Sequence, residues 1–193
     1  MFSAIFPVFC LGCEKFNEFI CFECAKAARI NPEQKREGFS FHSSFRYEGL
    51  IAEALHRAKQ QNQFGYLKVM ADLVRHSPPL DENPCLVPPS ANKAFRKRGF
   101  NPSFELAKLA GFNMSKEIIR IRQTDYQQGL DSSSRQSNIE NAFKVKKGGS
   151  FLLFDDVVTT GATVREMRRA VEDAGGEVAG IFALCSTSPK GAN

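Results

Sequence analysis

Four cysteines near the beginning of the chain have the spacing of metal ligands. Cys10 and Cys13 form one CxxC pair, and Cys21 and Cys24 form a second. A two-residue spacing lets both thiolates point at one ion, and two such pairs close a tetrahedral shell around zinc. The alternatives are two disulfides, unliganded core thiols, or a rubredoxin-like iron site with the same spacing. We expect a structural Zn²⁺ that supplies the folding free energy of a small module at residues 1–30.

Two adjacent carboxylates, Asp155 and Asp156, follow a short apolar run near the other end of the chain. The run, Phe151–Phe154, is typical of a strand buried on both faces. Ligands of open parallel sheets bind at the carboxyl ends of the strands. At such a place, carboxylates accept hydrogen bonds from neighbouring hydroxyl groups of a sugar.

The polar run after the carboxylates has the composition of a phosphate-binding loop. Thr159, Thr160 and Thr163 supply hydroxyl groups, and Gly161 lets the backbone approach a ligand closely. The amides at the start of the following helix favour an anion. Neither GxxxxGK[ST] nor GxGxxG occurs, which argues against a nucleoside triphosphate or a dinucleotide. If the threonines only capped the helix, the pair of carboxylates would stay unexplained, so a sugar phosphate is the expected ligand.

Positive charge is concentrated in the middle of the chain. The net charge is +5, but residues 92–147 carry 12 basic and 5 acidic side chains, whereas residues 1–91 carry 10 of each. The candidate nucleic-acid contacts are Lys93, Arg96, Lys97, Arg98, Arg120 and Arg122. A diffuse basic segment suits a phosphate backbone, and a solvated surface is the alternative. Phe95 and Phe100 interleave the run, where they either stack on bases or belong to the core.

The composition is that of an ordinary globular protein. The chain has 193 residues, of which 42% are hydrophobic and 24% are charged. The apolar start is interrupted by Pro7 and Cys10, so it predicts neither a signal peptide nor a membrane span. We therefore expect a cytoplasmic protein with reduced thiols.

Hydrophobic patterning predicts an α/β fold with a mostly parallel sheet flanked by helices. The clearest unit is a strand, helix and strand over residues 151–185. Asn101 is expected to cap a helix that Gly111 ends, and residues 26–38 to form a linker. The remaining expected elements are a half-buried strand at 39–47, two helices at 50–74 separated by Gly65, and short strands at 85–87 and 118–121.

The carboxylate pair and its loop resemble the diphosphoribosyl-binding signature of the type I phosphoribosyltransferases. The resemblance implies that Asp155 and Asp156 take the ribose hydroxyls of phosphoribosyl pyrophosphate. It implies further that the 5-phosphate is held by the loop residues Val158, Thr159, Thr160, Gly161, Ala162 and Thr163. A loop after an earlier strand would bind the pyrophosphate with Mg²⁺, and here its residues are Pro88, Pro89 and Ser90. Oxygen atoms of the substrate would supply most of the ligands of that ion.

The order of motifs along the chain resembles the ComF family of competence proteins. These motifs are the two CxxC pairs, Tyr47-x-Gly49, Arg96-x-Arg98-Gly99-Phe100-Asn101, Gln127 or Gln128, Arg135-x-x-Asn138, Ala142-Phe143 and the carboxylate loop. The usual Val-Pro-Val-Pro of the family stands here as Leu86-Val87-Pro88-Pro89. The resemblance implies a phosphoribosyltransferase-like domain at 39–193 after the zinc module. It also implies handling of incoming single-stranded DNA in natural transformation, at the inner face of the cytoplasmic membrane, with a helicase and recombination mediators as partners.

Two functions remain open from the sequence. One is a DNA-handling protein that retains a phosphoribosyl pyrophosphate site. The other is an active phosphoribosyltransferase of nucleotide or base metabolism, whose basic segment attracts an anionic substrate. The sequence identifies no catalytic nucleophile, so it does not decide between them.

Overall fold

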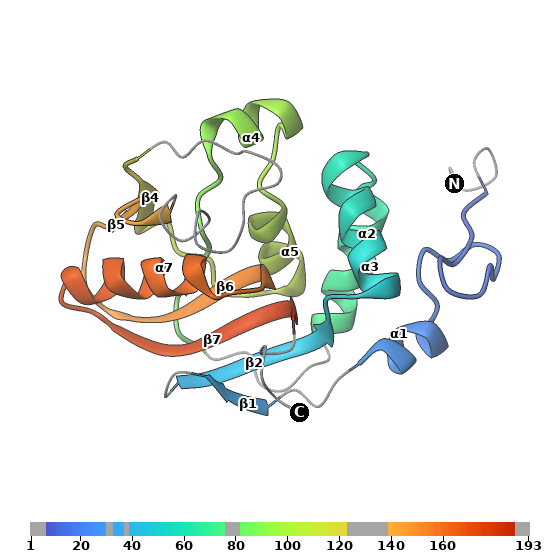
Figure 1. The fold of residues 1–193 in the computed structure, drawn as a ribbon, viewed down its shortest axis with the longest axis horizontal. Helices are drawn as coiled ribbons and strands as arrows, with labels where there is room; N and C mark the ends of the chain where they lie inside the picture. Colours follow the sequence, from blue (N-terminus) through green and yellow to red (C-terminus); the bar gives the residue numbers. More distant parts are fainter. Residues whose placement is uncertain (1–6, 30–32, 37–38, 76–81, 123–138, 188–193) are drawn as a thin grey trace.

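The computed structural model describes residues 7–29, 33–36, 39–75, 82–122 and 139–187 (Figure 1). Its elements are α1 (Phe22–Ala28), β1 (Glu33–Arg36), β2 (Phe39–Arg46), α2 (Gly49–Gln60), α3 (Phe64–Arg75), β3 (Cys85–Leu86), α4 (Asn92–Arg98), α5 (Pro102–Ala110), β4 (Ile118–Arg120), β5 (Phe143–Val145), β6 (Ser150–Val158), α7 (Ala162–Asp173) and β7 (Glu177–Ser186). Several residues of the ComF-like pattern, Gln127, Gln128, Arg135 and Asn138, lie outside the described residues.

The main sheet has five strands in the order β1-β2-β7-β6-β3. β2, β7, β6 and β3 are parallel, and β1 pairs antiparallel with β2 at one edge. β4 and β5 form a separate antiparallel pair. The expected α/β class with a mostly parallel sheet is confirmed.

Helices cover both faces of this sheet, as Figure 1 shows. On one face Met167 and Val171 of α7 belong to the same apolar cluster as Leu153 of β6. On the other face α2, α3 and α5 pack against Phe154 and Phe182 of the central strands. Alternate residues of β6 thus enter two cores, which explains why its apolar run is continuous.

Several predicted elements are present with small differences. Asn101 caps α5 by accepting a hydrogen bond from the Phe104 amide at 3.4 Å, and Gly111 ends the helix with φ 92°. The predicted strand, helix and strand unit is β6, α7 and β7. β2 is buried and not half-buried over Ser43 to Phe45, and its Phe41 and Phe45 belong to the two different apolar clusters.

Three expectations about element bounds are wrong. The helices of residues 50–74 separate near Asn62, which has φ 54°, and Gly65 lies within α3. The strand expected at 151–154 extends through Asp155 and Asp156 to Val158, which was expected in the loop, because pairing with β7 continues to Val158. The segment expected as a linker contains the end of α1 and all of β1.

The N-terminal segment packs against the helices beside the sheet. The Phe19 and Tyr66 rings meet edge to face at 4.8 Å between centroids, and the Arg29 guanidinium donates to the Leu73 carbonyl at 2.7 Å. Gly65 makes room for this packing, since a Cβ there would lie 2.1 Å from Cζ of Phe19. The division into residues 1–30 and 39–193 stays a prediction, but the described part of the first segment rests directly on α3.

Across the described ranges, no helix combines the length and the apolar character needed to span a bilayer.

Candidate functional site

The carboxyl ends of the parallel strands meet at one edge of the sheet. The Tyr47 amide after β2 donates to the Ser186 carbonyl at 2.8 Å, and the Thr187 amide after β7 donates to the Val158 carbonyl at 3.1 Å. The segments that follow β2, β6 and β7 are therefore adjacent. This edge is where open α/β sheets bind ligands.

Asp155 is a buried carboxylate at this edge, with 8% of its surface exposed. Its Oδ1 accepts hydrogen bonds from the Ser103 hydroxyl at 3.3 Å and from the Asp156 amide at 2.9 Å. Burial, followed by the charge of Asp156, raises the pKa of Asp155 to about 7. A carboxyl group in this range changes its protonation near neutral pH.

Asp156 lies beside a lysine that the sequence motifs did not reveal. Nζ of Lys59, on α2, is 2.9 Å from Oδ1 and 2.9 Å from Oδ2 of Asp156. Burial acts to lower the pKa of Lys59, but the Asp156 charge and hydrogen bond outweigh it and raise that pKa. The two residues are 97 positions apart, so no local pattern indicates this pair.

The predicted phosphate loop joins β6 to α7. Gly161 has φ 78° and is the N-cap of α7 without any side-chain cap. The Thr160 hydroxyl accepts from the Ala162 amide at 3.4 Å, so this threonine satisfies one amide in the first turn of α7. Arg165, also missed from the sequence, donates to the Thr160 carbonyl at 2.8 Å. The loop thus presents hydroxyls and helix amides beside the buried carboxylates.

The second predicted loop, Pro88–Ser90, follows β3 and is held by two side chains. The Asn101 amide donates to the Pro88 carbonyl at 2.9 Å, and Nε of Arg120 donates to the Pro89 carbonyl at 2.9 Å. The Arg120 guanidinium also lies 4.8 Å from the centroid of the Phe143 ring. Burial, and then the nearby Arg122, lowers the pKa of Arg120. The Arg120 side chain is therefore directed toward the Pro88–Ser90 loop and the buried Phe143 ring.

The other predicted nucleic-acid contacts are divided between α4 and the end of β4. Arg96 and Lys97 on α4 are exposed, Arg98 is half-buried, and the side chain of Lys93 lies outside the described part. Arg122 donates to the Glu140 carbonyl at 2.5 Å. Phe95 is 48% exposed, whereas Phe100 is buried against the exposed Phe64 with 4.4 Å between centroids. Of the two aromatic residues in the basic run, Phe95 is the exposed one.

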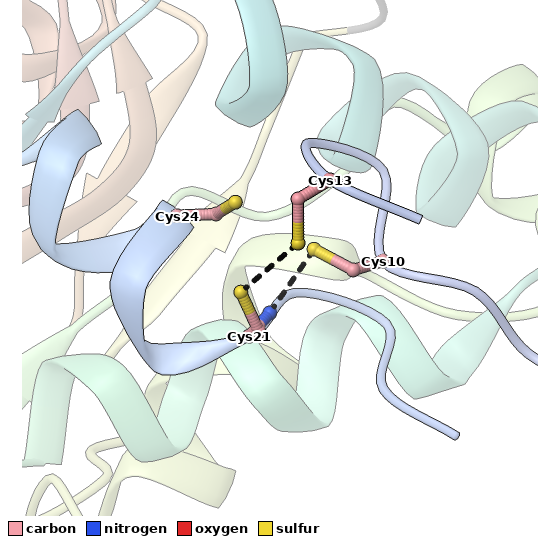
Figure 2. A group of neighbouring side chains, drawn as sticks. All are labelled: Cys10, Cys13, Cys21 and Cys24. Atoms are coloured by element: carbon pink, nitrogen blue, oxygen red, sulfur yellow. Dashed lines mark hydrogen bonds between the residues drawn. The ribbon is translucent and has the colours of Figure 1, made fainter. Parts of the chain in front are cut away.

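The four N-terminal cysteines converge, as Figure 2 shows. Their sulfur atoms all lie within 4.8 Å of one another, and Sγ of Cys13 is 3.5 Å from Sγ of Cys21. Zinc–sulfur bonds of ~2.3 Å in a tetrahedron place sulfurs roughly 3.8 Å apart. All six cysteines are free thiols, and Cys85 and Cys185 are buried elsewhere. Four thiols at this spacing fit a tetrahedral metal site of the structural zinc type.

Backbone amides already stabilise negative charge in this cluster. The Cys21 amide donates to Sγ of Cys10 at 3.2 Å, and the Gly12 amide donates to the same sulfur at 3.5 Å. Burial acts to raise the pKa of Cys10, but these amide hydrogen bonds outweigh it and lower the pKa to about 6. A thiolate is the form that binds a metal.

Comparison with known proteins gives one family match and several relatives. Residues 96–192 match the family "Phosphoribosyl transferase domain". The DNA utilization protein YhgH of Salmonella typhi is 32% identical over 117 residues, covering 56% of this chain and 51% of the relative. The competence protein ComFC of Streptococcus pneumoniae is 27% identical over 154 residues, covering 76% of this chain and 68% of the relative. The chain thus spans about half the length of the first relative.

Comparison with solved structures gives a match to the adenine phosphoribosyltransferase of Rhodothermus marinus DSM 4252. It is 21% identical, the match covers 85% of both chains, and the TM-score is 0.39.

Proposed function

Because the chain belongs to the phosphoribosyl transferase domain family, we propose that its sheet edge binds phosphoribosyl pyrophosphate and that the protein handles single-stranded DNA during DNA uptake. One observation carries the first part of this proposal. The two buried carboxylates lie near the end of β6, next to the loop that leads into α7. Carboxylate oxygens that can accept from sugar hydroxyls therefore lie beside loop hydroxyls and helix amides that can donate to a phosphate. Asp155 and Asp156 would accept from the ribose hydroxyls, and Val158 to Thr163 would surround the 5-phosphate.

The second loop completes the proposed site. Pro89 and Ser90 would face the pyrophosphate, with a Mg²⁺ held mainly by ligand oxygens that neutralises part of its charge. Asn101 and Arg120 hold the carbonyls of Pro88 and Pro89, which restrains the loop that carries the Ser90 amide and hydroxyl. The loop therefore needs little reorganisation when an anion binds.

The sugar-phosphate site is tested by calorimetry with phosphoribosyl pyrophosphate and Mg²⁺. Replacing both carboxylates by amides (Asp155→Asn with Asp156→Asn) keeps their shape and removes the charge-assisted hydrogen bonds. Each such bond contributes ~1.5 to 3 kcal/mol, so the loss of two bonds should lower the affinity by at least about a hundredfold. Glu177→Ala is the matched control, because this exposed carboxylate lies at the opposite end of β7. Unchanged affinity in the double amide variant would reject the site.

The DNA role rests on the relatives and on the exposed face of α4. The relatives are named for DNA utilization and for competence. Arg96 and Lys97 are exposed on α4 next to the exposed ring of Phe95, which offers cations to phosphates and one face to a base. Arg98 and Arg122 remain in the proposed contact set. A competence helicase and recombination mediators are the proposed partners in the cytoplasm.

Salt dependence tests this interface. Binding of a single-stranded oligonucleotide should weaken as salt rises, because phosphate contacts release counterions. Replacing Arg96 and Lys97 by alanine removes two cations, so the slope of log K against log salt should become shallower by ~1.4. Lys68→Ala on α3 is the control, since this exposed lysine lies outside the basic segment. A slope that stays the same in the double variant would exclude α4 from the interface.

The cellular role needs a genetic readout. Transformation frequency in a deletion strain should return with the wild-type chain and stay low with the double amide variant. If that variant restored the transformation frequency fully, DNA uptake would not depend on the sugar-phosphate site.

A further inference from the structure

We infer that Lys59 is a positioning residue of the sugar-phosphate site, which holds the Asp156 side chain through an ion pair and keeps it oriented toward the ligand's hydroxyls. The inference rests on the proposed function, because it assigns a role within the same site. Lys59 belongs to α2, outside the residues 96–192 that the family match covers. It places a basic residue from a second part of the chain directly beside the carboxylate pair.

The contact geometry supports positioning. Nζ of Lys59 is 2.9 Å from each carboxylate oxygen of Asp156, so the ammonium lies across the fork of the carboxylate. An ionised carboxylate offers about four acceptor positions, so these two bonds leave others for ligand hydroxyls. The Lys59 side chain is 23% exposed and that of Asp156 is 8% exposed, which places the pair at the solvent end of the buried strand.

The surrounding charges show why a cation is needed. The charged and titratable groups that face Asp156 are Lys59 of α2, Asp155 of the same strand, and Cys185 of β7, whose thiol is 3.4 Å from the Asp156 carbonyl. Two adjacent buried carboxylates repel each other, and Lys59 acts against this repulsion: burial and Asp156 raise the pKa of Asp155, while Lys59 lowers it. Without Lys59, the pKa of Asp155 would rise further, so the carboxylate pair would keep its proton to a higher pH.

A protonated carboxyl group is a poorer partner for a sugar hydroxyl. It donates one hydrogen bond and loses charge-assisted acceptance, whereas two vicinal hydroxyls need acceptors. Lys59 also reduces the net negative charge that an incoming pyrophosphate meets. Loss of the lysine should therefore weaken binding and make it depend more strongly on pH.

The test is calorimetry with phosphoribosyl pyrophosphate and Mg²⁺ across pH 6 to 9, on folded protein checked by circular dichroism. Lys59→Gln keeps a hydrogen-bond donor but removes the charge, so we expect at least about a tenfold loss of affinity at pH 7. The midpoint of the pH profile should also move up by about one pH unit, because more base is needed to ionise Asp155. Lys59→Arg keeps the charge and should restore the midpoint, and Lys68→Gln on α3 should change neither quantity.

The outcomes separate the inference from the proposed function. If the wild-type chain does not bind phosphoribosyl pyrophosphate, the proposed function fails. If the wild type binds and Lys59→Gln has the same affinity and pH midpoint, Lys59 only packs against Asp156 and the inference fails. Should Lys59→Gln not fold, a crystal structure of the wild-type complex decides. Lys59 must then still contact Asp156 while Asp156 contacts the ribose, and a lysine that has swung away overturns the inference.

Discussion

Replacing Gly65 by alanine should destabilise the protein, although alanine is the better helix former. Gly65 lies in the first turn of α3, where its added Cβ would lie 2.1, 2.3 and 2.6 Å from three carbons of the Phe19 ring. Contacts this short require the ring to move away from α3. The substitution therefore measures how tightly the cysteine segment is docked.

The magnitude follows from opposing effects. Overpacking a fitted contact typically costs ~1 to 3 kcal/mol, and the displaced ring also weakens its edge-to-face contact with Tyr66. Alanine in place of glycine recovers ~0.5 to 1 kcal/mol of helix stability. We expect a net loss of about 1 to 2 kcal/mol, which for a chain of this size lowers Tm by about 2 to 4 °C per kcal/mol.

A double-mutant comparison tests the contact between Gly65 and Phe19 directly. In a Phe19→Ala background the clash is gone, so Gly65→Ala should stabilise by ~0.5 to 1 kcal/mol and the sign of its effect should reverse. Phe22→Ala is the matched control, because Phe22 is 68% exposed and its loss should leave the clash in place. Urea unfolding of the zinc-loaded proteins gives the free energies. If Gly65→Ala stabilises the wild-type chain, Phe19 does not dock where the structure places it.

Three further predictions concern the metal, the buried carboxylate and the second loop. Elemental analysis should find ~one zinc per chain. A variant with both Cys10→Ser and Cys21→Ser should lose the zinc and should unfold at a lower temperature. A wild-type chain that is folded without metal would contradict this prediction. The folded-state pKa of Asp155, which burial and Asp156 raise to about 7, lies above its unfolded value near ~4, so the folded chain holds an extra proton between them. The unfolding free energy in urea should therefore fall as pH rises through this window, and Asp155→Asn should flatten that slope; an equal slope in both proteins would refute the assignment. Arg120→Ala should lower the unfolding free energy by ~1.5 to 3 kcal/mol through its lost bond to Pro89 and should weaken sugar-phosphate binding. The salt slope for DNA should stay unchanged, and a shallower slope would show that Arg120 contacts DNA.

The sequence predicted local features well and distant contacts poorly. Asn101 and Gly111 mark a helix by their own backbone chemistry, and the cysteine spacing is set within a few residues, so both could be found without a structure. Lys59 could not, because its partner is 97 positions away. The sequence predicts a helix break at Gly65, whereas in the structure the missing side chain makes room for Phe19.

The basic segment shows a second reason why the sequence did not predict the site fully. Charge counts treat all cations alike, but Arg120 faces a loop carbonyl and an aromatic ring, while Arg96 and Lys97 face solvent. The apolar run alone predicts a strand that ends at Phe154. The structure continues it through Asp155 and Asp156, which are unfavourable in strands by propensity, because pairing with β7 overrides that preference.

The strand order has a consequence for how the protein is made. β6 and β7 follow every other strand in the described chain, yet they occupy the middle of the sheet between β2 and β3. A ribosome releases β2 and β3 long before the strands that join them, so the nascent chain holds two unpaired strand edges and uncovered helix faces. The docked cysteine segment and α3 can assemble during this interval, but the sheet closes only after residue 186 has emerged. A chain that stops before β7 should therefore have its sheet divided between β2 and β6, with the β1–β2 and β3–β6 pairs no longer joined.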